Sequence, residues 1–135
     1  MIGRRLLWTA PIALLAVVLS ACSGGSESTQ TSLAAQASAD LVAAGGPLYQ
    51  ASCAQCHGAD LRGTALGPSH LSVVYEPNHH GDAAFVLAAR NGVRQHHWPY
   101  GDMPPIPGLT DDDLASIVAF VRDQQRIHGF EPYPP

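Results

Sequence analysis

The sequence of 135 residues contains no lysine, and charged residues of both signs make up only 13% of it. All seven basic residues are arginines, and the formal net charge is −4. A nucleic-acid-binding surface needs clustered positive charge against phosphates, so this function is excluded. A coiled coil needs dense charge, so the low charge content argues against one. A disordered chain has few apolar residues, whereas 46% of this chain is hydrophobic, which argues against full disorder. The length therefore predicts one small globular domain.

Cysteine is also scarce. The three cysteines are too few for a disulfide scaffold, and their odd number indicates that they have different roles. Only one long apolar run occurs, over residues 6–21, and it follows Arg4 and Arg5 and contains Pro11. A membrane-spanning helix needs about 20 apolar residues, so this shorter run predicts a signal peptide over residues 1–21. The paired arginines do not complete a twin-arginine motif, which favours general secretion.

The end of the signal peptide, Leu19-Ser20-Ala21-Cys22, resembles the lipobox of bacterial lipoproteins, in which the cysteine is lipidated and becomes the first mature residue. The alternative is an incidental cysteine at this position. Residues 22–39 are small and polar and lack aromatic anchors, so we expect a lipidated flexible linker. Such a coil would hold the domain over residues 40–135 about 20 to 25 Å from the lipid. The less favoured alternative is a spacer that merely tolerates proteolysis.

The sharpest signal is Cys53-Ala54-Gln55-Cys56-His57, because C-x-x-C-H is the haem attachment sequence of c-type cytochromes. On a helical turn, thiols at positions i and i+3 share one face and can add to the two vinyl groups of haem. The imidazole that follows can then bind the iron as an axial ligand. The pattern predicts one haem c, bound covalently through Cys53 and Cys56, with His57 on the iron.

Three other interpretations of this motif remain. A thioredoxin-type redox pair follows a β-strand, and no β-branched strand precedes Cys53. A zinc site needs further ligands, while Cys22 is separated by the linker. A disulfide across so short a loop would be strained and would leave His57 unexplained.

From residue 40 to about residue 128, the chain resembles the class I cytochrome c family. The segment Gly46-Pro47-Leu48-Tyr49 is similar to the family's opening helix, and Gly67-Pro68 resembles the loop whose proline carbonyl accepts a hydrogen bond from the haem-binding histidine. The segment Met103-Pro104-Pro105 resembles the one that brings a methionine sulfur to iron. The resemblance implies an all-α fold of three to five short helices around a covalently attached haem, with His57 and Met103 as iron ligands.

The chain contains seven histidines, so a histidine other than His57 could be the sixth ligand of the iron in place of Met103. His96 and His97 precede Met103 closely, and either could bind the iron instead. Methionine followed by two prolines fits a rigid extended ligand loop better, so Met103 is preferred. Trp98 and Tyr100 are expected in core packing, at the haem edge or in partner contacts. The remaining histidines are expected on surfaces or in loops: His70, His79, His80 and His128.

Two helices are predicted beyond the motif. The first begins at Asp82 as N-cap, carries Phe85, Val86 and Ala89 on one apolar face, and stops at Asn91-Gly92. The second runs from Leu109 to Arg126 and begins with a cap formed by Thr110 and Asp113. Its negative residues 111–113 lie at the positive dipole end and Arg122, Arg126 and His128 at the other. Its apolar stripe, Leu114, Ile117, Val118 and Val121, is expected to pack on the helix that carries Leu48 and Tyr49.

These features predict a membrane-tethered monohaem cytochrome c that carries single electrons outside the cytoplasmic membrane, and not an enzyme. The expected donor is a quinol-oxidising complex or a dehydrogenase, and the expected acceptor is a terminal oxidase or reductase. Without lysine, and with a charge of −6 after removal of the signal peptide, docking must use apolar contacts or acidic patches. The alternatives are a dedicated haem subunit of a periplasmic dehydrogenase or oxidase complex, and a haem enzyme or gas sensor with a labile distal ligand.

Overall fold

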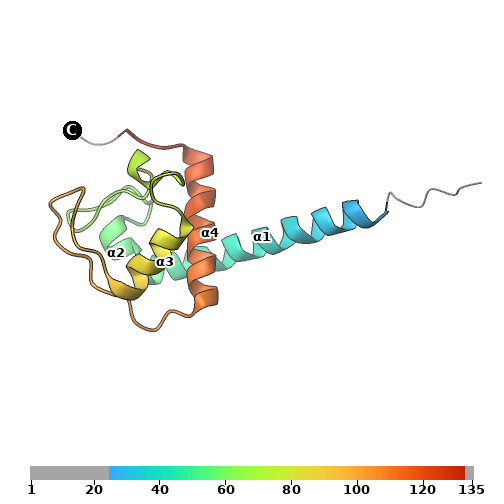
Figure 1. Ribbon diagram of the computed structural model, residues 1–135, viewed down its shortest axis with the longest axis horizontal. Helices are drawn as coiled ribbons and strands as arrows, with labels where there is room; N and C mark the ends of the chain where they lie inside the picture. The colour runs from blue at the N-terminus through green and yellow to red at the C-terminus, as the bar shows by residue number, and fades with distance from the viewer. Residues whose placement is uncertain (1–24, 133–135) are drawn as a thin grey trace, which may run out of the picture.

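The computed structural model describes residues 25–132, and this part of the chain is all-helical, as the sequence predicts. Its elements are α1 (Gly25–Ser52), α2 (Ala54–His57), a 3₁₀ turn η1 (Val73–Tyr75), α3 (Asp82–Asn91) and α4 (Asp111–His128). Figure 1 shows α4 running across α1, with α2, α3 and the connecting loops gathered on one side. The described residues form no strand, only isolated β-bridges.

Helix α1 overturns the expectation of a coiled linker, because residues 25–39 belong to it. Figure 1 shows its N-terminal half projecting from the rest of the molecule, and residues 30–41 are exposed. The small, polar composition of residues 25–39 did not predict their conformation correctly. Alanine, leucine and glutamine, which are frequent between residues 30 and 44, have high helix propensity, and Gln36 Nε2 donates to Asp40 Oδ1 at 3.0 Å one turn on.

The C-terminal part of α1 packs against α4, as predicted, and a glycine makes the close approach possible. A Cβ atom on Gly45 would overlap the backbone oxygen of Ser116 and lie 2.7 Å from the Cβ of Phe120. One turn later, Tyr49 is fully buried with its ring centroid 5.5 Å from that of Phe120. Tyr49 and α4 residues Ile117 and Val121 belong to the main core cluster. Burial of an aromatic ring of this size removes about 150–250 Å² from water.

Helix boundaries agree closely with the local signals. Thr110 forms a capping box with Asp113, and Gly92, with a φ of 73°, ends α3 after Asn91. The α3 N-cap is Gly81, so Asp82 is the first helical residue and not the cap. Its carboxylate accepts from Arg122 Nε at 2.7 Å, which leaves it unavailable as a side-chain cap.

The three apolar residues predicted to share one face of α3 line two different cavities. Phe85 and Ala89 line a central cavity, whereas Val86 lines a separate hollow beside α4 and α1. The hollow includes Val42, so part of the projecting helix borders it. Only two of the three residues assigned to this apolar face therefore serve the cavity.

Arg122 joins α4 to the segment before α3. Its guanidinium donates to the carbonyl oxygens of Tyr75 and His80, each at 2.6 Å, and to Gln125 Oε1 at 2.7 Å. It also pairs with Asp82. From the sequence, we expected Arg122 to interact with the negative end of the helix dipole. In the structure its side chain is half-buried and connects segments that are distant in the sequence.

The predicted signal peptide over residues 1–21 and the lipidation at Cys22 lie outside the described residues. Between residues 25 and 132, no helix combines the length and the apolar character needed to cross a bilayer.

Candidate haem site

The attachment motif forms one tight helical turn. Cys53 precedes α2, and its carbonyl oxygen accepts from the backbone N–H groups of Cys56 and His57 at 3.1 and 3.0 Å. Both thiols are free and half-buried. Burial raises the pKa of the Cys53 thiol to about 11, so this thiol is protonated at neutral pH. On a helical turn of this kind, side chains at positions i and i+3 share one face, although Cys53 lines the cavity and Cys56 is not among its lining residues.

His57 is held by the loop that follows it. Its Nδ1 lies 2.9 Å from the carbonyl oxygen of Pro68, which confirms the hydrogen bond implied by Gly67-Pro68. A carbonyl oxygen can only accept, so Nδ1 carries the proton and Nε2 keeps its lone pair. Burial lowers the pKa of His57, although the bond to Pro68 opposes this shift. The imidazole is therefore neutral at pH 7 and can bind a metal through Nε2.

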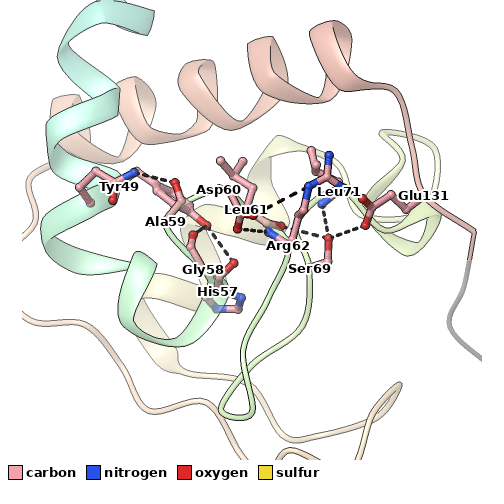
Figure 2. Close-up of polar contacts among 11 residues, drawn as sticks. Tyr49, His57, Gly58, Ala59, Asp60, Leu61, Arg62, Ser69, Leu71 and Glu131 are labelled. Carbon is pink, nitrogen blue, oxygen red and sulfur yellow. Dashed lines mark hydrogen bonds and ion pairs between the residues drawn. The ribbon is translucent and has the colours of Figure 1, made fainter.

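The loop between His57 and Ser72 is stabilised by residues that precede it and by residues that follow it in the sequence, as Figure 2 shows. Tyr49 donates from its hydroxyl group to the carbonyl oxygen of Gly58 at 3.1 Å. Ser69 Oγ donates to the carbonyl oxygen of Leu61 at 3.0 Å and to Glu131 at 3.2 Å. Glu131 in turn pairs with Arg62. The fixed loop keeps the Pro68 carbonyl in place under His57.

A cavity of about 460 Å³ lies between these elements. Cys53, His57 and Met103 all line it, so the structure brings together three of the four residues predicted for the haem site. Its apolar lining includes Phe85, Val93, Ile106, Leu109, Ile117 and Val121. Two thiols, a neutral imidazole nitrogen, a thioether and an apolar chamber are the donor set and surroundings that haem c requires, so these residues fit the group.

Met103 reaches the cavity from the loop between α3 and α4. It exchanges a pair of backbone hydrogen bonds with Val93, both 2.9 Å. A Cβ on Gly92 would lie 2.5 Å from the Met103 carbonyl oxygen and 3.2 Å from the nitrogen of Pro105. Gly92 is thus required for close packing of the methionine loop as well as for ending α3, a second role that its sequence context did not reveal.

His70 was expected on the surface or in a loop, and it lies in a loop but is buried. It is 7% exposed and stacks on His57 with 3.9 Å between ring centroids. Its Nδ1 is buried without a hydrogen-bond partner among the described residues. Burial lowers the pKa of His70 well below its ordinary value, so the ring is neutral. Its position two residues after Pro68 and beside Leu71 was the available signal that it enters the core.

The other singled-out aromatic and imidazole residues lie around the same cavity. Trp98 is half-buried and stacks on Tyr75 with 6.0 Å between ring centroids, whereas Tyr100 is 43% exposed. Both contribute to the lining, as do His96 and His97. The two histidines therefore stay candidates for the sixth ligand beside Met103. His79 and His128 are exposed, as expected.

A covalent haem attachment motif at the edge of an apolar cavity, in a small all-helical fold, defines a class I monohaem c-type cytochrome. The family model for cytochrome c matches residues 42–125, and the chain therefore belongs to this family of haem electron-transfer proteins. Among curated proteins it is similar to cytochrome c-551 of Bacillus subtilis (strain 168), with 33% identity over 108 residues, covering 78% of this chain and 82% of the relative. No solved structure matches it.

Proposed function

We propose that this protein is a membrane-tethered carrier of single electrons, with His57 and Met103 as the two axial ligands of its haem iron. The observation that carries the proposal is that a neutral, oriented imidazole and a thioether line one apolar cavity. When bound, haem c supplies an iron that alternates between Fe(III) and Fe(II).

The protein's own residues set the properties of that iron. His57 presents Nε2 because Pro68 holds the Nδ1 proton. The thioether of Met103 favours the reduced state relative to a second imidazole, and two axial ligands leave no position for a substrate. A closed site is the reason for proposing a carrier and not an enzyme.

For the tether we propose lipidation of Cys22 after removal of residues 1–21, which places the protein on the outer face of the cytoplasmic membrane. A quinol-oxidising complex or a dehydrogenase would donate electrons, and a terminal oxidase or reductase would accept them. The acidic, lysine-free mature chain supports docking through apolar contacts or acidic patches.

An optical spectrum combined with a redox titration tests the electron-carrier proposal. We expect one reversible one-electron wave, no carbon monoxide binding to the ferrous protein on mixing, and the weak red absorption band of Fe(III) bound to a thioether. Rapid carbon monoxide binding would contradict the closed site and favour an enzyme or sensor. Replacement of Cys22 with alanine tests the tether separately, because the mature protein should then leave the membrane fraction with its spectrum unchanged.

A further inference from the structure

Four histidines form a cluster beside the haem cavity, and three of them, His80, His96 and His97, also line that cavity. His79 and His80 lie in the turn between η1 and α3, and His96 and His97 lie in the loop between α3 and α4. Neighbouring rings have centroids 4.3 to 5.8 Å apart. The fold thus brings together two short histidine pairs that the sequence separates by α3.

Three of these side chains converge on one point. His79, His80 and His97 each offer a ring nitrogen, and the three nitrogens lie within 4.8 Å of one another. The Nε2 atoms of His79 and His97 are 3.4 Å apart. Two nitrogens bound to one tetrahedral metal ion at about 2.0–2.1 Å are themselves separated by about 3.4 Å. This pair already has the spacing of two ligands that share one ion.

The third ring is oriented as a metal ligand usually is. His80 Nδ1 lies 2.8 Å from the carbonyl oxygen of Val74, so Nδ1 carries the proton and Nε2 keeps its lone pair. Histidine ligands in proteins are commonly fixed by such a bond from the other ring nitrogen. Burial and the neighbouring imidazoles lower the pKa of His80 and His97, which favours the neutral, metal-binding form.

The charges around the cluster do not prevent a cation from binding. Arg122 donates to the His80 carbonyl oxygen, and its guanidinium is paired with the carboxylate of Asp82. The convergent donors are all imidazoles, a set that suits zinc, copper or nickel and not magnesium or calcium, which prefer oxygen.

We propose that His79, His80 and His97 form a binding site for one divalent transition-metal ion, distinct from the haem iron. An ion bound there joins the turn before α3 to the loop that carries Met103. It therefore stabilises the segment on the methionine side, where the described structure has few other connections. This site rests on one part of the proposed function, namely that Met103 and not His97 is the sixth ligand of the iron.

Titration calorimetry of the purified holoprotein with Zn²⁺ tests the site, because zinc is redox-silent. The affinity tag must be removed and the protein treated with a chelator beforehand. We expect one Zn²⁺ per chain. The affinity should fall roughly tenfold or more in His79→Ala and in His97→Ala, because each loses a ligand.

His96→Ala is the matched control, since its ring is next to His97 but lies outside the convergent set. His128→Ala controls for exposed histidine elsewhere. Both should bind Zn²⁺ as the parent does. The haem spectrum should be unchanged in His79→Ala and His128→Ala, because neither residue lines the haem cavity.

Three results would overturn the proposal. They are the absence of stoichiometric Zn²⁺ binding, unchanged affinity in both ligand variants, and a changed haem spectrum in His79→Ala, which would assign the cluster to the iron. Failure of the electron-carrier proposal would be visible differently, as a missing redox wave in protein that still binds Zn²⁺.

Discussion

The two sides of the cavity are built in different ways. On the side of His57, the ligand and its partner Pro68 are eleven positions apart, and a network of side-chain bonds fixes the loop between them. On the side of Met103, the loop is held internally by backbone bonds to Val93 and by side-chain bonds of Gln95 and Asp102, and one backbone bond, from Ile106 N to the Ala89 carbonyl oxygen, ties it to α3. The difference indicates that His57 is tied to the rest of the fold by more bonds than Met103 is.

The largest effect is expected on the His57 side. Replacement of Cys53 and Cys56 with serine removes both thioether bonds, so haem should be extracted by acid acetone from whatever protein accumulates, whereas the parent keeps its haem in the protein fraction. Retention of haem in the double variant would contradict the covalent site. Each single variant should retain one bond and show weakened maturation.

Met103→Ala should alter the iron strongly and the fold little. Loss of the thioether lowers the reduction potential and opens the iron to carbon monoxide. Because the loop is held by backbone bonds, unfolding by denaturant should change by only about 1 kcal/mol or less. In Met103→His the site should stay closed. If the parent spectrum lacks the red band and both variants keep that spectrum, His96 or His97 must be the ligand, and His→Ala at that position would then change the spectrum.

Gly45→Ala tests how far the His57 side depends on the crossing of α1 and α4. The new Cβ would overlap the Ser116 backbone, so stability should fall by about 2 kcal/mol. Gly46→Ala is the matched control, because its Cβ would meet only the Phe120 ring at 3.6 Å and alanine favours the helix. It should be neutral or stabilising by up to about 1 kcal/mol. Equal denaturation midpoints would refute the role assigned to Gly45.

Gly92→Ala applies the same reasoning to the Met103 side. Gly92 and Gly101 both have positive φ, but only at Gly92 would a Cβ meet other atoms, those of Met103 and Pro105. Gly92→Ala should therefore cost about 1 kcal/mol more than Gly101→Ala and weaken the red band. A red band that is equally strong in the two variants would show that the methionine loop adapts without strain.

The smallest effect is expected at Thr110, where the methionine loop ends and α4 begins. Hydrogen bonds from Thr110 lower the pKa of Asp113 below its ordinary value of 3.8. Their stabilisation is present above that value and is lost as the pH falls through the lowered pKa. Thr110→Ala should raise the Asp113 pKa in an NMR titration and flatten the stability profile in this acidic range. An unchanged pKa would refute the capping interaction.

Sequence reasoning succeeded where the determining contacts are local. The attachment motif, the capping box of Thr110 and the stop at Gly92 each depend on a few neighbouring residues. It failed where helix propensity was misjudged, and where the determining contacts join residues that are distant in the sequence. Residues 25–39 are helical because their alanines favour a helix, and His70 is buried because Tyr49, Tyr75 and Phe85 surround it from distant segments. The convergence of His79 and His97 likewise requires the fold.

The contact of Gly45 with Ser116 also constrains the order of events during synthesis. These residues are roughly 70 positions apart, so the contact closes a loop that contains nearly the whole domain. A chain that emerges from its N-terminus cannot form this crossing until α4 has been made. Until α4 is available, Cys53 and Cys56 belong to a chain whose core has not closed, so we expect that haem attachment can precede closure of the core. Folding that depends on so distant a contact is expected to be slow for a helical protein.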